Sequence, residues 1–481
     1  MHTADSNSTH SNQAVTKAIL VLLLLGTVIY SFVISLHYDW LQRIPGWFFS
    51  RKESLAFPYD YGFLFFMLVF AFFVIWFVFK FSNWVSIDIL LVIILFLVLQ
   101  IGYGVVKGGG FESIRLKYAK AAISEELQTV CQAHEGLLSS VRNYDSLYGE
   151  NFWLGTKPPG FFLFYAAIKD AVGLFRPAVL ANPKACFITL TKNFAYLFPI
   201  FATIVLIPLF FIQSQLSSMS FSYASILTYI SAPSVLLMTL LPDQFLFPML
   251  FTVYLLVLTF MITKQSTLFA FLAGGMAYLL VFMSFSLLPI FGLTLFWLSA
   301  DFWINRETRT LKTLFLLLSA FLGGLLLAVL VTWLFLGYNP LTRYQLAFQK
   351  HREIKQFEFS VKRIFEYGLL NHVDFMLWTG FGILFLFYVS SIRASILFLQ
   401  NKASTYDGFR VAFFLTFIAI NLAGQTRSEV GRLWVFLLPG MALSIFPETL
   451  NLLRKSMLSF QLFFLLQMLS TFLIFYYIRF P

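Results

Sequence analysis

The sequence predicts an all-α protein, a polytopic bundle of transmembrane helices. Of its 481 residues, 59% are hydrophobic and only 11% are charged, and the mean hydropathy is +0.81. Soluble domains keep about a quarter of their residues charged. Apolar runs of roughly 20 residues, the length that crosses a bilayer as a helix, follow one another along the chain. We therefore expect a single transmembrane domain over residues 17–481 with about 13 spans, preceded by a disordered polar N-terminus over residues 1–16.

The first apolar run has no cleavage-site pattern after it, so we expect it to remain as a membrane anchor. The expected spans lie near residues 17–37, 61–81, 86–106, 159–176, 193–213, 245–263, 267–285, 287–301, 312–337, 374–392, 408–424, 432–447 and 457–478. Residues 220–241 are also apolar, but a Ser-Ala-Pro-Ser sequence interrupts them at 231–234. Such a break fits a re-entrant segment that is buried in protein and leaves on the face where it entered.

Basic residues between the spans predict the topology. They gather in four connections, which contain Arg176, Lys184 and Lys192; Arg306, Arg309 and Lys312; Arg393, Lys402 and Arg410; and Arg454 and Lys455. Cytoplasmic loops collect Lys and Arg, so we expect these connections and the N-terminus in the cytoplasm. This topology requires the segment 220–241 to be re-entrant. The loops 38–60, 107–158, 338–373 and 425–432 and the turn at 242–243 then share the outer face.

The loop 107–158, the first large outer loop, is predicted to contain amphipathic surface helices. Its apolar residues recur at helical spacing at Leu116, Ala119, Ile123, Leu127 and Val130, and again from Leu137 to Tyr148. Helices of this kind lie either on lipid or against the rest of the protein, and the pattern fits both.

Several functions are excluded or disfavoured by what the sequence lacks. The six histidines are scattered, and His134-Glu135 has no second histidine four residues further on, so no metal site is predicted. No basic stripe with interleaved aromatic residues lies outside the membrane segments, so nucleic acid is not an expected partner. The two cysteines, Cys131 and Cys186, are expected to be separate small buried residues rather than a disulfide framework.

Lys157 is the first candidate for a functional residue. Lys157, Pro158 and Pro159 directly precede an apolar run, and proline is well placed in the first turn of a helix. The lysine then lies at the mouth of that helix, at the boundary between membrane and water. A helix start explains the two prolines but not the cation, so Lys157 is a candidate ligand for an anion.

Two further groups of charges lie near the ends of apolar runs on the same predicted face. Asp243 follows Pro242, where it fits either a helix cap or a functional charge near the membrane. Arg427, Glu429 and Arg432 cluster where another apolar run begins. Glu429 and Arg432 are spaced to pair on a helix, which leaves one arginine for a phosphate group.

The loop 338–373 is rich in cations. It contains Arg343, Lys350, His351, Arg352, Lys355, Lys362 and Arg363 against Glu353, Glu358 and Glu366. Such a mixture is typical of a solvated helical face. On an outer face, however, an excess of cations favours an anionic partner, and a lipid phosphate bound by His351 and Arg352 is the natural one.

On these residues, the chain resembles the polytopic C-type glycosyltransferases. This superfamily includes the protein O-mannosyltransferases and the bacterial transferases that take a sugar from a polyprenyl phosphate carrier. In these enzymes, the helix after the first catalytic-side loop opens with a His/Lys-Pro-Pro motif, which Lys157, Pro158 and Pro159 match. The segment 427–434 and the position of Asp243 are also similar to those of bacterial members. The order of elements is similar over most of the chain, but the matching motifs are short.

The resemblance implies an acidic residue early in that loop as the base that activates the acceptor. Glu112 matches this position as the first carboxylate of the loop, and Glu125, Glu126, Asp145 and Glu150 are the alternatives. The chain departs from the family in two respects. The usual Asp-Glu pair is missing, and two extra apolar spans precede the loop.

The expected function is therefore a membrane glycosyltransferase of a bacterial inner membrane. It would move a sugar from a polyprenyl-phosphate donor to a glycan, lipid or protein acceptor on the outer face. A carboxylate would deprotonate the acceptor, and Lys157 with Arg352, Arg427 or Arg432 would stabilise the leaving phosphate. No cofactor is expected, and with these cations at hand a divalent metal is not required.

Two other functions fit the same composition. One is a transporter or flippase of a lipid-linked or anionic solute, which should show repeat symmetry and charges in the middle of its spans. The other is a ligase or polymerase of glycan chains, which would use a long outer loop in the same way.

Overall fold

The computed structural model describes residues 5–36, 61–80, 85–105, 111–120, 123–133, 137–151, 154–177, 182–217, 223–238, 241–355, 360–423 and 430–478. Over these residues the chain is helical and forms no β-strand, which confirms the all-α prediction. Nine helices in this part of the chain are long and apolar enough to cross a membrane. The chain is therefore an integral multi-pass membrane protein. The expected number of about 13 spans is not confirmed.

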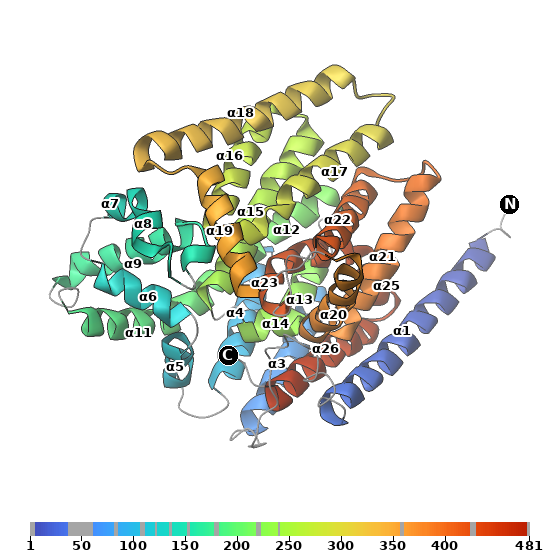
Figure 1. Ribbon diagram of the computed structural model, residues 1–481. Helices are drawn as coiled ribbons and strands as arrows, with labels where there is room; N and C mark the ends of the chain where they lie inside the picture. Colours follow the sequence, from blue (N-terminus) through green and yellow to red (C-terminus); the bar gives the residue numbers. More distant parts are fainter. Residues whose placement is uncertain are drawn as a thin grey trace.

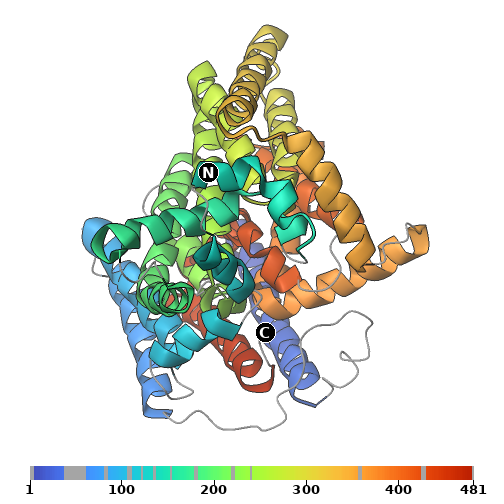
Figure 2. The same ribbon diagram turned by 60° about the vertical axis from the view of Figure 1, so that its left-hand side comes forward.

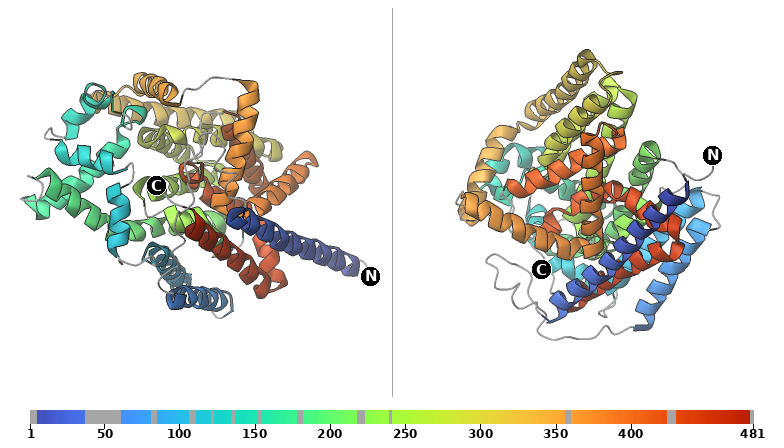
Figure 3. Two further views of the ribbon diagram at one scale, coloured as in Figure 1. Left: turned by 60° about the horizontal axis from the view of Figure 1, so that its bottom comes forward. Right: turned by 90° about the vertical axis from the view of Figure 1, so that its right-hand side faces the viewer.

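The nine candidate spans supply the frame of the bundle. They are formed by α1 (Asp5–Leu36), α3 (Tyr61–Lys80), α4 (Val85–Val105), α11 (Pro183–Ala202) continued through η2 (Thr203–Val205) into α12 (Leu206–Leu216), α15 (Pro242–Lys264), η4 (Phe285–Leu287) with α17 (Pro289–Ile304), α18 (Leu311–Leu336), α21 (Phe381–Leu399) and α26 (Met457–Tyr477). α1 begins at Asp5, where the sequence predicted disorder as far as residue 16. α1 and α26 lie side by side along one edge of the bundle (Figure 3).

Shorter helices fill the bundle. They are α13 (Tyr223–Ser231), α14 (Pro233–Met238), α16 (Thr267–Met283), α20 (Val361–Thr379), α22 (Thr405–Leu422), α23 (Val430–Leu433), η5 (Val435–Leu437), α24 (Leu438–Ser444) and α25 (Phe446–Lys455). The segments Val435–Ser444 and Phe446–Arg454 bend by 52° where they meet and would make a tenth span if they cross together.

One side of the molecule carries a group of short helices that we call the cap. The cap consists of α5 (Phe111–Lys120), α6 (Ile123–Gln132), α7 (Leu137–Arg142), α8 (Tyr144–Tyr148), η1 (Leu154–Thr156), α9 (Gly160–Phe175) and α19 (Pro340–Lys355). Figure 1 shows α5 to α9 at the left, away from the N-terminus, and α19 beside them toward the middle of the molecule. Figure 2 brings these helices forward. The predicted span 159–176 is not confirmed: it forms α9, which has 16 residues, is not among the candidate spans and packs on α6 within the cap.

The amphipathic helices of the loop 107–158 pack on protein. Tyr118 of α5 is fully buried, and its ring meets the edges of Phe194 and Phe198 of α11 at centroid distances of 6.0 and 5.7 Å. In α6, Leu127 and Val130 are buried, as their spacing predicted. α5, however, is rotated relative to the expected stripe, because Leu116 is exposed and Ile114 and Tyr118 face the core.

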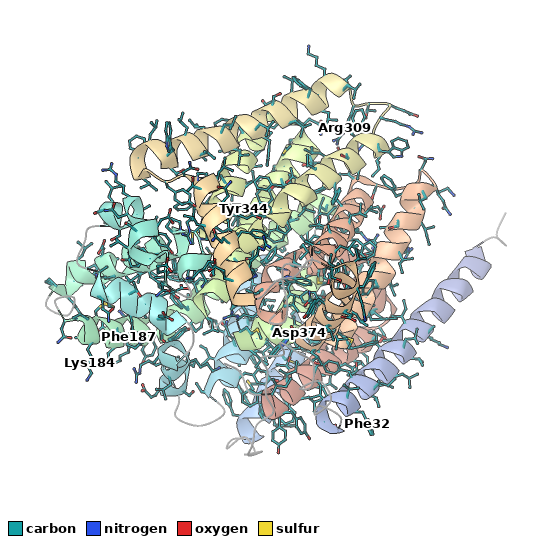
Figure 4. The ribbon with its side chains drawn as sticks, in the orientation of Figure 1. Phe32, Lys184, Phe187, Arg309, Tyr344 and Asp374 are labelled. Atoms are coloured by element: carbon teal, nitrogen blue, oxygen red, sulfur yellow. A yellow bond between two sulfur atoms is a disulfide. The ribbon has the colours of Figure 1, made fainter. Side chains whose placement is uncertain are left out.

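A disulfide joins the cap to the bundle, and it corrects two predictions. Cys131 of α6 and Cys186 of α11 are bonded, with a Cα–Cα distance of 5.8 Å, so they are not separate buried thiols. The bond also places the connection before α11 on the cap side, although its basic residues predicted the opposite side. Figure 4 shows Lys184 near the cap and Arg309 at the far end of the molecule.

Lys169 of α9 reinforces this junction. Its Nζ donates to the carbonyl oxygens of Val130 and Ala133, at 2.9 and 3.1 Å, and so caps the C-terminal end of α6. Burial lowers the pKa of Lys169, and the neighbouring Asp170 opposes this shift. Two bonds to carbonyl oxygens beside a disulfide hold α6, α9 and α11 in one arrangement.

The segment predicted as re-entrant forms two buried helices in tandem. α13 and α14 meet at Ala232 and Pro233, and all their residues are buried. α13 packs on α12, α24, α25, α26 and α4, and α14 packs on α26, α4 and α20, so both helices lie inside the bundle.

The contact between α16 and α18 depends on glycine. A Cβ on Gly274 would collide with the carbonyl oxygen of Phe321, and a Cβ on Gly324 would collide with that of Phe271. The two backbones therefore lie against each other, as at small-residue interfaces of membrane helices. α18 exposes most of its remaining surface and packs mainly on α16.

Candidate functional site

The Lys-Pro-Pro motif lies where the cap meets the bundle. Pro159 precedes α9 with helical dihedrals, and the helix starts at Gly160, so the predicted helix start is confirmed. Before it, the single turn of η1 ends with a bond from the backbone N–H of Lys157 to the carbonyl oxygen of Leu154, at 3.1 Å. Pro158 and Pro159 are buried, while the Lys157 side chain is 34% exposed. The prolines thus fix the backbone and leave the cation accessible.

Lys157 forms an ion pair with Glu126 of α6. The Nζ atom contacts Oε1 of Glu126, whose side chain is only 1% exposed. The second carboxylate oxygen, Oε2, is buried and has no hydrogen-bond partner among the described residues. The ammonium group also lies 5.9 Å from the centre of the Phe161 ring. A buried carboxylate is therefore covered by a lysine that reaches the surface.

Arg343 of α19 holds the turn that carries Lys157. Its Nε donates to the carbonyl oxygen of Lys157 at 3.1 Å, and Nη2 donates to the carbonyl oxygens of Leu154 and Gly155. Its Nη1 pairs with Oδ1 of Asp145 at 2.5 Å. Only 1% of the Arg343 side chain is exposed. A guanidinium suits this position because its planar fork can donate in several directions at once.

Sequence reasoning counted Arg343 among seven basic side chains of one loop and gave it no role. Its contacts reach residues far away in sequence, so neither periodicity nor spacing marks it. The nearest signal is Asn339-Pro340, which begins α19 shortly before the arginine.

Two tyrosines line the same cluster. Tyr144 donates its hydroxyl to the carbonyl oxygen of Leu154 at 3.2 Å, and its ring lies 5.4 Å from the Arg343 guanidinium. Burial, and then the negative charge of Glu126, raise the pKa of Tyr144 well above its ordinary value. The hydroxyl of Tyr338 is buried and has no hydrogen-bond partner among the described residues. We call Glu126, Asp145, Lys157, Arg343, Tyr144 and Tyr338 the cap cluster.

Asp145 and Glu150 both meet cations of α19. Asp145 belongs to the cap cluster and is 45% exposed, with one oxygen bonded to Arg343. Glu150 is fully exposed and pairs with Lys350 at 3.2 Å. Asp145 thus links α8 to α19 within the cap cluster, whereas Glu150 forms an exposed ion pair with the same helix.

The structure does not bring Glu112 into the cap cluster. Glu112 pairs with Arg115 on its own helix, and its side chain is 56% exposed. The hydrogen bond from Arg115 lowers the pKa of Glu112 below its ordinary value. The role that the resemblance implies for Glu112 therefore has no geometric support. Glu126, one of the alternatives, has the contact with Lys157.

The other predicted phosphate ligands have different surroundings. Arg352 is exposed, and its guanidinium lies 6.0 Å from the Phe348 ring on the same helix. His351 is half-buried next to Lys350. Arg427 and Glu429 lie outside the described residues, as does the side chain of Asp243, although α15 does begin at Pro242.

Arg432 lies on α23, whose start is held by a buried acid that sequence reasoning missed. Oδ2 of Asp374 accepts a hydrogen bond from the backbone N–H of Val430 at 2.9 Å, and Asp374 is 1% exposed. Figure 4 shows Asp374 within the bundle, on α20. Asp374 was placed in a predicted span, where a lone acid is costly and is itself a signal of function.

A second buried ion cluster lies at the end of the bundle opposite the cap. Arg410 of α22 is 3% exposed and bonds Asp407 at 2.7 Å and the carbonyl oxygen of Ser390 at 2.5 Å. Glu448 of α25 lies 3.8 Å from Arg410 and 3.5 Å from Arg393. Arg410 had been predicted in a solvent-facing basic connection. Its contacts instead tie α21, α22 and α25 together.

Metal binding has no support in the described part of the chain, where no three His, Cys, Asp or Glu residues are grouped to hold an ion.

Comparison with known proteins adds no family. No protein-family model matches the sequence, and no curated protein matches it.

Proposed function

We propose that the protein is a membrane glycosyltransferase, which moves a sugar from a polyprenyl-phosphate donor to an acceptor at the membrane boundary. The observation that carries the proposal is Lys157. This lysine is one-third exposed, its backbone is fixed by Arg343, and its ammonium group is paired with a buried carboxylate. A fixed cation next to acidic groups, at the junction of cap and bundle, suits a reaction in which a phosphate leaves and a hydroxyl loses a proton.

The lipid nature of the donor follows from the location of the site. The cap cluster lies beside apolar helices long enough to cross the membrane, and α9 begins directly after Lys157. A carrier with a long hydrocarbon chain could remain in the bilayer while its phosphate reaches the lysine. The motif's resemblance to that of the C-type glycosyltransferases supports the same donor class.

The disulfide supports an outer-face location for this site. Disulfides persist in oxidising compartments and are rare in the cytoplasm. Cys131 and Cys186 are both in or next to the cap. The cap then faces the outside of a bacterial inner membrane, and the basic residues around Arg309 face the cytoplasm, in agreement with the positive-inside rule.

The test uses purified full-length protein and polyprenyl-phosphate-linked hexoses and pentoses. We expect native mass spectrometry to detect one bound donor on the parent and at least a tenfold weaker complex on Lys157→Gln, because the cation that meets the phosphate is removed. The control is Lys362→Gln, which removes an 84% exposed lysine of α20.

Incubation with acceptor extracts should release free polyprenyl phosphate with the parent protein only. Donor binding and movement between leaflets without sugar transfer would instead favour the transporter or flippase. Equal donor binding by the parent and Lys157→Gln would contradict the role of Lys157.

A further inference from the structure

We propose that Glu126 and the donor phosphate compete for Lys157, and that the carboxylate released by this competition is the base that deprotonates the acceptor. This inference rests on the proposed function. It assigns two roles to one ion pair: Glu126 neutralises Lys157 until the donor binds, and then takes the acceptor's proton.

The surroundings of the five candidate carboxylates favour Glu126 as the base. Glu125 accepts a hydrogen bond from the side-chain amide of Asn151 at 3.0 Å. Glu112 and Asp145 each bond an arginine, and Glu150 is fully exposed beside Lys350. A guanidinium cannot give up its charge, so it permanently weakens the basicity of its partner. Glu126 pairs with a lysine, and its Oε2 has no hydrogen-bond partner among the described residues.

The exposure of the two side chains suggests how the exchange occurs. Glu126 is 1% exposed and Lys157 is 34% exposed, so the lysine lies between the carboxylate and the surface. An approaching phosphate meets the lysine first. Because the lysine stem is flexible and its backbone is held by Arg343, the ammonium group can turn to the phosphate while the turn stays in place. That movement opens a path to the carboxylate.

Loss of its cation makes Glu126 a better base. A buried carboxylate without an opposite charge takes up a proton more readily, because burial disfavours the charged form. When Lys157 turns to the phosphate, Glu126 is therefore left without the cation that competes with the acceptor's proton.

The transfer step balances without a further reagent. The acceptor O–H bond breaks and its proton passes to Oε2 of Glu126. The acceptor oxygen forms a bond to the anomeric carbon as the bond from that carbon to the phosphate oxygen breaks. The departing polyprenyl phosphate keeps the electron pair, and Lys157 stabilises its charge. Release of the phosphate and loss of the proton to water restore the ion pair.

The experiment compares Glu126→Gln with the parent, using polyprenyl phosphate without sugar as the binding probe. If Glu126 competes with the phosphate, its removal should tighten probe binding about tenfold. If Glu126 is also the base, transfer should fall by roughly 10² to 10⁴. The control is Glu366→Gln, which removes an exposed carboxylate that pairs with Lys362 on α20. It should change neither quantity.

Folding is checked in each variant by the Cys131–Cys186 disulfide and by thermal unfolding. If Glu126→Gln fails to fold, Glu126→Asp keeps the charge but retracts it, and should likewise bind the probe more tightly and transfer more slowly. Tighter binding combined with slower transfer is the expected result, and a purely structural role for Glu126 would not produce it.

Unchanged or weaker probe binding by the variant, in a parent that binds and transfers, would overturn the competition. Transfer at the parent rate would overturn the role as base. A parent that neither binds the probe nor transfers a sugar would instead contradict the proposed function, and the inference would fall with it.

Discussion

Arg343 donates a hydrogen bond to the backbone carbonyl of Lys157 across 186 residues of sequence. The same guanidinium pairs with Asp145, so α19 holds the turn before α9 and the side chain of α8 together. The position of the proposed phosphate ligand therefore depends on a helix that comes four candidate spans later in the chain.

Replacing Arg343 should destabilise the cap. Arg343→Gln would leave Asp145 without its cation and the carbonyl oxygens of Lys157 and Gly155 without a donor, and we expect a loss of about 3 kcal/mol. Arg343→Lys should recover little of this loss, because an ammonium group lacks the planar fork. Thermal unfolding in detergent measures the change. Equal stability of the lysine variant and the parent would contradict the role of Arg343 in holding the turn before α9.

Removing the disulfide should loosen the cap and leave the membrane helices in place. The bond closes a loop of 55 residues, for which chain entropy predicts a loss of about 4 kcal/mol. Cys131→Ser with Cys186→Ser should make the cap more sensitive to proteolysis from the outside. Intact-mass measurement before and after reduction checks the bond itself. Two free thiols in protein from its own membrane would contradict both the pairing and the proposed outer location.

Glu112→Gln tests the role implied by family resemblance. We expect transfer to remain near the parent rate at pH 7, because Glu112 pairs with Arg115 away from the cap cluster. The lowered pKa of Glu112 means that this pair stabilises the folded state above the ordinary glutamate pKa. That contribution is lost as the pH falls through the folded-state pKa. Unfolding midpoints of parent and variant should therefore converge on acidification. Abolished transfer would restore Glu112 as the base.

Arg410→Met should be among the most damaging substitutions at the end opposite the cap. It leaves Asp407 and Glu448 as buried acids without their shared cation, and we expect a loss of about 3 to 5 kcal/mol. Arg393→Met is the matched control, because Arg393 also meets Glu448 but is 59% exposed. It should cost less than about 1 kcal/mol. Similar unfolding temperatures for both variants would show that burial of Arg410 does not matter.

Composition and periodicity were sufficient for the all-α class and for the helix that starts directly after Pro159, since both depend on local sequence. They failed at α9 because an apolar run of 16 residues is short for a span and fits a helix buried in protein. The charge rule grouped Lys184 with the other basic connections, whereas the Cys131–Cys186 bond places it beside the cap.

The candidate site was predicted in part. Lys157 was identified because a cation beside two prolines is a local anomaly. Glu126 remained one of several carboxylates, since only the fold shows which of them is buried against the lysine. Arg343 and Asp374 act through backbone groups of segments distant in sequence, and no residue pattern records such contacts.

The glycine contact between α16 and α18 has a consequence for assembly in the membrane. An apolar helix gains no hydrophobic free energy by exchanging lipid for a neighbouring helix. α18 is therefore retained by the close approach of its backbone to α16 at Gly274 and Gly324. Because α18 continues through Gly337 into α19, a larger residue at either glycine would also displace Arg343. The position of the proposed phosphate ligand thus depends partly on two buried glycines in a distant part of the bundle.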